Sequence, residues 1–159
     1  MGWKPQNIIQ RRSRYTYGFH LKEPFRAGID PEQLRVNYDG DFDCKWRFRK
    51  MIEKGQIVEY GQTFTFEAYD RATTVEEKCE ERFVDLYRST HEDPQYCIEE
   101  DCSLVGTITL IPPSDGWPDE WDHGLHLIVG ETEFTVKDLN LDTPGKTMKH
   151  KWIFCNYKQ

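Results

Sequence analysis

Histidine and cysteine side chains are the groups in this sequence best suited to bind a metal or to act in covalent catalysis. His123 and His126 are three residues apart, with Asp122 beside them. That spacing would put two ligands on one face of a helix, but it points them to opposite faces of a strand. The alternation around them favours a strand. Cys97 and Cys102 are five residues apart and are not followed by a second pair at a metal-ligand spacing. We therefore interpret these residues as structural.

No motif predicts catalysis or nucleotide binding. A nucleophilic Ser or Cys needs a positioned base, and the sequence has no Gly-x-Ser-x-Gly elbow. Neither the Walker spacing nor Gly-x-Gly-x-x-Gly is present. The acidic run Glu99-Glu100-Asp101 lacks the alternating acidic positions and the Gly of a calcium loop, which indicates a solvated loop. We expect the chain not to be an enzyme and to bind no cofactor or metal.

One basic segment could bind nucleic acid or acidic lipid. In Lys45-Trp46-Arg47-Phe48-Arg49-Lys50, cations alternate with rings that could stack on bases. The competing interpretation is an amphipathic helix of about two turns over 44–52, because the alternation there is not clean and Glu53-Lys54-Gly55 is a plausible helix stop. The formal net charge is −7, so nucleic acid is the disfavoured partner.

Length and composition describe one globular domain. The chain has 159 residues, of which 37% are hydrophobic and 14% aromatic, enough ring area to build a core. No run of 18 apolar residues predicts a membrane helix, and no apolar segment near the N-terminus predicts a signal peptide. The five cysteines are odd in number and irregular in spacing, which is typical of reduced thiols. We expect a cytoplasmic protein that does not enter membranes.

Period-two alternation returns along the chain and predicts strands. A short turn at Gly130-Glu131 predicts a hairpin. The expected fold is mainly β: an antiparallel β-sandwich of about eight strands with one short helix. The expected strands cover 15–21, 63–68, 83–87, 104–110, 123–129, 134–136 and 150–154, with shorter ones near 34–37 and 56–59.

Two stretches resemble the substrate-binding β-domain of the heat shock 70 kDa chaperone family. The first begins with Tyr17-Gly18-Phe19-His20-Leu21 and continues at 51–58 and at Gln62-Thr63-Phe64-Thr65-Phe66, where the family has Gln-Thr-Phe-Thr-Thr. The second runs from Leu104 to Pro113 and is followed by Gly116 and Pro118, as in the family. The divergent 12A/12B-like branch is more similar still, because it shares Arg-Arg-Ser-x-x-Thr-Tyr-Gly, here 11–18, and a motif close to Gly130–Glu133.

The resemblance implies a domain order. In the family an ATPase domain precedes this region, so residues 1–12 are expected to be the tail of a missing ATPase domain and 13–157 the substrate-binding-like sandwich. We expect this chain to contain neither that ATPase domain nor the helical lid that covers the bound peptide in the family. Weak peptide binding is therefore expected.

The resemblance also implies the site residues. The family binds an extended hydrophobic peptide in a groove, and the matching positions here are Phe19, Leu21, Lys22, Phe64, Ala68, Val84 and Leu86. Lys22 falls where conventional members have an apolar residue that arches over the peptide. The arch partner falls at Glu67 or Ala68.

The implied function is a chaperone-like module that binds unfolded or extended polypeptide. Its own ATPase domain, in a longer protein, is a further candidate partner. Two alternatives stay open. The sandwich could be a scaffold or regulatory interaction domain that has lost the groove, which the charge on Lys22 motivates. The segment 45–50 could instead bind nucleic acid or acidic lipid.

Overall fold

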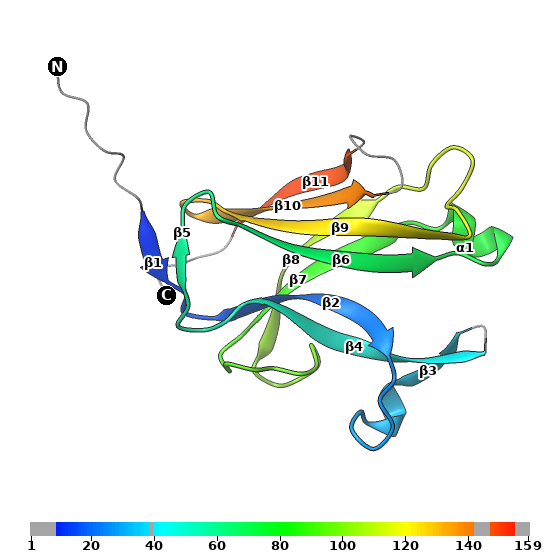
Figure 1. Ribbon diagram of the computed structural model, residues 1–159, viewed down its shortest axis with the longest axis horizontal. Helices are drawn as coiled ribbons and strands as arrows, with labels where there is room; N and C mark the ends of the chain where they lie inside the picture. Colours follow the sequence, from blue (N-terminus) through cyan, green and yellow to red (C-terminus); the bar gives the residue numbers. More distant parts are fainter. Residues whose placement is uncertain (1–8, 39, 142–146, 155–159) are drawn as a thin grey trace.

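The computed structural model describes residues 9–38, 40–141 and 147–154, and it is mainly β (Figure 1). Eleven strands, one short α-helix and one 3-10 helix lie within the described residues. The predicted fold class, an antiparallel sandwich-like arrangement with one short helix, is confirmed. The strands are more numerous than the eight expected, because short edge strands add to the long ones.

Two antiparallel sheets form the layers. The five-stranded sheet has the order β3-β4-β2-β7-β8 and the four-stranded sheet the order β11-β10-β9-β6. A separate two-stranded sheet pairs β1 (Gln10–Arg12) with β5 (Ile57–Glu59). The bounds of the larger sheets are β2 Thr16–Pro24, β3 Arg35–Tyr38, β4 Asp41–Ile52, β6 Thr63–Arg71, β7 Arg82–Ser89, β8 Cys102–Leu110, β9 Glu120–Val129, β10 Glu133–Asn140 and β11 Thr147–Phe154.

One apolar core lies between the two larger sheets. Along most of the long strands alternate residues point into it, which is why period-two alternation was visible in the sequence. Figure 1 shows the two layers stacked, with β6 and β9 facing β2 and β4. The buried members from the two larger sheets include Tyr17, Phe19, Ile52, Val84, Leu86, Ile108, Leu110, Trp121, Leu125, Leu127, Val129, Phe134 and Val136.

The hairpin predicted at Gly130-Glu131 is confirmed. Val129 of β9 pairs with Phe134 of β10, and Gly130 donates its backbone N–H to the carbonyl of Glu133. The two short strands expected near 34–37 and 56–59 correspond to β3 and β5. The sequence Asp142-Thr143-Pro144-Gly145 also predicts a turn, but these residues lie outside the described ones.

The helix predicted over 44–52 is wrong: these residues belong to β4, which pairs with β2 and β3. Cys44, Phe48 and Ile52 are buried at a spacing of four, which suits a strand face as well as a helix face. Trp46 has a positive φ of 67°, and the register with β2 shifts twice. These bulges interrupt the alternation that would have identified the strand.

The short helix lies elsewhere. Helix α1 covers Val75–Cys79. It lies within residues 70–81, a charge-rich stretch whose composition is typical of a linker. The hydroxyl of Thr74 accepts a hydrogen bond from the Glu77 backbone N–H at 3.1 Å. Thr74 and Glu77 therefore have the Thr-x-x-Glu spacing of a helix N-terminus, a signal that was available in the sequence. The 3-10 helix covers Glu32–Leu34.

Residues 10–12, part of the segment expected to be the tail of a preceding domain, are strand β1. They pair with β5 in register Gln10 to Glu59 through Arg12 to Ile57. Residues 1–8 lie outside the described residues. This two-stranded sheet ties the start of the described chain to the segment that leads into β6.

Candidate functional site

Three of the seven predicted peptide-binding residues are core side chains. Phe19 on β2 and Leu86 on β7 are directly paired and fully buried. Val84, two residues earlier on β7, is 6% exposed. These three side chains pack in the core between the sheets. None of them can contact a bound molecule unless the core rearranges.

The other four lie at the margin of this core. Leu21 and Phe64 are half-buried and pack against it. Ala68 is also half-buried, and Lys22 is exposed. Phe19, Val84 and Leu86 thus belong to one core cluster, and Leu21 and Phe64 pack against that cluster. Ala68 pairs with His123 of β9, and Lys22 lies over the ring of Tyr38.

Strand β6 forms one edge of its sheet. It pairs with β9 along all nine of its residues, and in the described part of the chain no strand pairs with its other side. Phe64, Phe66 and Ala68 are half-buried, whereas the residues between them are exposed. Because side chains alternate along a strand, these three face the other layer.

Strand β4 lies across from this edge and contributes charged side chains. The guanidinium of Arg49 stacks over the ring of Phe66, with its carbon 4.5 Å from the ring centroid. Arg49 also forms a short ion pair with Glu23 of β2. We call the region formed by Leu21, Glu23, Arg49, Phe64, Phe66 and Ala68 the β4–β6 seam. Here the two layers meet through a cation and a ring instead of aliphatic packing.

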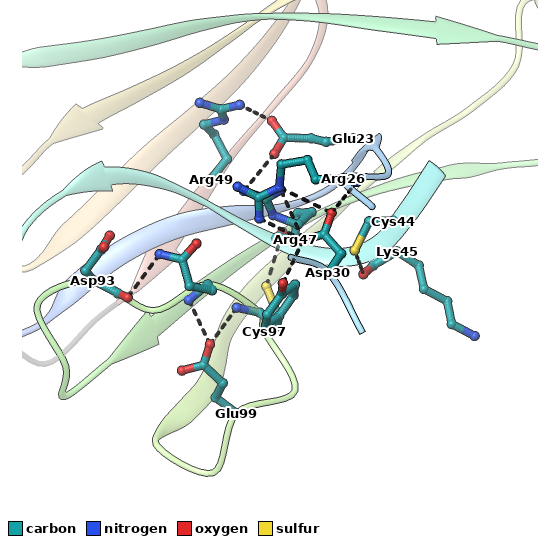
Figure 2. Close-up of polar contacts among 12 residues, drawn as sticks. Glu23, Arg26, Asp30, Cys44, Lys45, Arg47, Arg49, Asp93, Cys97 and Glu99 are labelled. Atoms are coloured by element: carbon teal, nitrogen blue, oxygen red, sulfur yellow. Dashed lines mark hydrogen bonds and ion pairs between the residues drawn. The ribbon is translucent and has the colours of Figure 1, made fainter. Parts of the chain in front are cut away.

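Beside the seam, a polar network holds the segment after β2 in place (Figure 2). Asp30, whose side chain is fully buried, accepts hydrogen bonds from the Arg26 backbone N–H at 2.8 Å, from Arg26 Nη2 at 2.7 Å and from the Tyr96 hydroxyl at 2.7 Å. These bonds, the one from Arg26 first, hold the pKa of Asp30 well below its usual range. The network fixes the 26–30 turn and the 91–101 loop to each other.

Arg47 connects this network to the seam. Its Nη2 lies 3.6 Å from a carboxylate oxygen of Glu23, and its Nη1 lies 3.7 Å from Asp30. Figure 2 shows Arg47 between the two acidic side chains, with Arg49 beyond Glu23. Glu23 is therefore shared by two guanidinium groups.

Tyr38 of β3 takes part in a second bridge between the layers. Its ring lies between two cations, with Lys22 Nζ at 5.0 Å and the Arg71 guanidinium carbon at 4.3 Å from the centroid. Arg71, at the end of β6, also donates to the Tyr38 carbonyl at 2.9 Å. The Tyr38 hydroxyl donates to Glu77 of α1 in a short hydrogen bond. Lys22, at the expected arch position, thus contacts a ring of its own sheet.

Sequence reasoning missed Arg49, Phe66 and Tyr38 as parts of this region. Phe66 continues the Phe64 alternation and could have been included on that signal. Arg49 was assigned to a helix, and a helix would have pointed it to solvent. Nothing local in the sequence places Tyr38 against Lys22 and Arg71.

The basic segment 45–50 has most of its charge paired internally. Arg47 and Arg49 contact acidic side chains, as described above. Lys50 forms ion pairs with Glu53 at 2.6 Å and Asp93 at 3.2 Å. Trp46 stacks face to face on His20, with ring centroids 4.4 Å apart. Trp46, Arg47, Arg49 and Lys50 therefore have partners within the fold.

The histidines and cysteines occupy separate structural positions. His123 points into the core, where its Nδ1 lies 2.8 Å from Asp138, and His126 is on the opposite face of β9. The thiols of Cys44 and Cys97 are buried, and burial raises the pKa of both. Among the residues that the structure describes, no group of three or more metal-ligating side chains occurs.

An open hollow of about 550 Å³ lies away from the seam. Polar side chains line it, and none of the seven predicted residues is among them. Its lining residues are Lys54, Thr90, His91, Glu92, Asp93 and Glu99.

Comparisons with protein-family models, with curated proteins and with solved structures find no match. No helix in the described residues is long and apolar enough to cross a membrane.

Proposed function

We propose that this chain is a chaperone-like module that binds extended polypeptide at the β4–β6 seam. The observation that carries the proposal is the unpaired edge of β6 beside the half-buried side chains of Phe64, Phe66 and Ala68. A free strand edge offers backbone donors and acceptors to an incoming strand, and adjacent apolar side chains supply contact area. The resemblance to the heat shock 70 kDa substrate-binding domain supports the same class of ligand.

Within this proposal the seven residues have two roles. Phe19, Val84 and Leu86 support the seam from the core. Leu21, Phe64 and Ala68 belong to the seam, and Lys22 follows Leu21 on β2. The module acts by binding and not by catalysis, in keeping with the absence of a catalytic motif from the sequence. The four described cysteines are free thiols, which supports the proposal of a cytoplasmic protein.

Fluorescence polarisation with a labelled seven-residue apolar peptide tests this function. The matched probe is the same peptide methylated on alternate backbone nitrogens, which removes the donors that would pair with a strand edge. We expect the methylated peptide to bind at least about tenfold more weakly, because backbone pairing supplies much of the affinity in strand addition. Equal binding of both peptides would exclude the β6 edge.

A pair of variants locates the binding. Phe66→Ala removes the ring at the seam and is expected to weaken peptide binding. Phe83→Ala removes a ring of the same type that is 60% exposed on β7, and it should leave binding unchanged. Equal weakening by both variants would argue against the seam.

A second function has its own supporting observation. Phe19 and Leu86 are fully buried, and Lys22 already has a ring partner in Tyr38. A domain that has lost its groove and serves as a scaffold or regulatory domain would have these features. Binding of a separately produced ATPase domain of the family, together with no binding of apolar peptides, would favour this alternative.

A further inference from the structure

The β4–β6 seam, taken together with the polar network beside it, has more positive than negative charge. Arg26, Arg47 and Arg49 contact only two carboxylates here, those of Glu23 and Asp30. The chain as a whole carries a formal net charge of −7. A local positive excess therefore stands out against an acidic molecule, and electrostatic complementarity favours an anionic partner at this place.

Arg49 is the one of these arginines that belongs to the seam itself, and it is accessible there. Its side chain is 40% exposed, compared with 38% for Arg26 and 13% for Arg47 in the network beside the seam. The Arg49 Nε is buried without a hydrogen-bond partner in the described part of the chain, as is the Arg47 Nε. The ion pair with Glu23 and the ring of Phe66 together hold the Arg49 guanidinium at the seam.

A ligand without a side-chain acceptor would bind less favourably at this place than one that has such a group. It would remove water from the exposed part of Arg49 and give no hydrogen bond in return. A carboxylate would restore such bonds, since a planar guanidinium and a carboxylate match in geometry. For this reason the expected ligand carries a carboxylate, unlike the purely apolar peptide that a hydrophobic groove would bind.

We propose that the polypeptide segment bound at the β4–β6 seam carries an Asp or Glu, flanked by apolar residues, whose carboxylate pairs with Arg49. This inference rests on the proposed function, because it names the class of segment bound at the same site. The flanking residues contact Phe64 and Phe66, and the carboxylate determines the register of the segment along β6.

Three labelled peptides test the inference. They share a Leu and Val background of seven residues and differ only at the central position, which is Glu, Gln or Lys. For the wild-type protein at low salt we expect the Glu peptide to bind about tenfold more tightly than the Gln peptide, and the Lys peptide to bind most weakly. The preference for Glu should shrink as salt is raised, because part of Arg49 is exposed.

Arg49→Gln is the decisive variant, and Arg35→Gln is its matched control. Arg35 is similarly exposed, at 44% of its side chain, and also stacks on rings, those of Phe25 and Phe42. We expect Arg49→Gln to abolish the preference for Glu over Gln while binding of the Gln peptide persists. Arg35→Gln should keep the preference.

Distinct results overturn the inference and the function beneath it. Equal binding of the Glu and Gln peptides to the wild-type protein, or a preference that survives in Arg49→Gln, overturns the inference and leaves peptide binding standing. Failure of all three peptides to bind overturns the proposed function and the inference with it. If Arg49→Gln does not fold, Arg49→Lys replaces it. That variant keeps a point charge but loses the planar fork, so a preference undiminished from wild type would count against guanidinium pairing.

Discussion

Asp30 is a buried carboxylate that keeps its charge because Arg26 and Tyr96 donate hydrogen bonds to it. Its pKa in the folded protein is lowered, so the folded state stays ionised at a pH where the unfolded chain already takes up a proton. The stabilisation from this group is present above the unfolded pKa, near ~3.9, and is lost as the pH falls toward the folded pKa. The network beside the seam should therefore weaken in acid.

Urea unfolding of the wild type and of Asp30→Asn at several pH values checks this expectation. At pH 7 the wild type should be the more stable, and the gap between the two proteins should narrow from pH 5 to pH 3. Asp115→Asn, a change at an exposed carboxylate, is the control and should leave the pH dependence as it is in the wild type. A gap that does not vary with pH would contradict the account of Asp30.

Gly18 lies on β2 in close contact with β4. A Cβ built there would lie 2.4 Å from the Arg49 carbonyl oxygen and 2.4 Å from a ring carbon of Phe48. Gly18→Ala should destabilise the fold by roughly 1–3 kcal/mol or more, since backbone has to move. Gly61→Ala, at φ 84° with open space around it, should cost only about 1–2 kcal/mol from its conformation. Equal losses in denaturant titrations would show that the close approach is absent.

At the scale of elements, the side chains of β7 alternate between the buried and the exposed face of the five-stranded sheet. Leu86 is fully buried and Phe83 is 60% exposed on the same strand. Leu86→Ala should lower the free energy of unfolding by about 2–5 kcal/mol, because it leaves a cavity in the core. Phe83→Ala should change it by less than about 0.5 kcal/mol. Comparable losses in the two variants, measured by urea unfolding, would mean that the faces of β7 are assigned incorrectly.

Strand β4 explains why a basic aromatic sequence need not be a nucleic-acid surface. Its bulge at Trp46 turns that ring onto His20, and its arginines pair with Glu23 and Asp30. Cations that are already neutralised release few counterions on binding a phosphate chain. Most cations of this segment are therefore paired within the fold, and the exposed part of Arg49 suits a single carboxylate and not a phosphate chain.

At the scale of the whole molecule, the formal charge of −7 should repel polyanions. We expect a labelled single-stranded oligonucleotide to show no binding at about 50 mM salt, where electrostatic attraction is strongest. The Arg47→Glu and Arg49→Glu variants should be equally inactive in this assay. A salt-dependent shift that these variants abolish would revive the nucleic-acid alternative.

The two layers were predictable because most of the long strands show local alternation of apolar and polar residues. The alternations at 63–68 and 123–129 determine which side chains can share a face, and the turn at Gly130 follows from its neighbours. The segment 44–52 was assigned incorrectly to a helix. Its strand conformation, with its bulges, depends on backbone hydrogen bonds to β2 and to the 91–101 loop. Local patterns cannot report such partners.

The amino-acid sequence by itself determined that this protein is a β-sandwich with an acidic surface and a core of alternating apolar residues. Only the tertiary structure decided that Phe19 and Leu86 are core, that Lys22 contacts Tyr38, and that Arg49 lies over Phe66 at an open strand edge. The physical reason is the range of the interactions. Alternation is a property of neighbouring residues, whereas burial and ion pairing arise between segments that are far apart in the chain and meet only when the sheets stack.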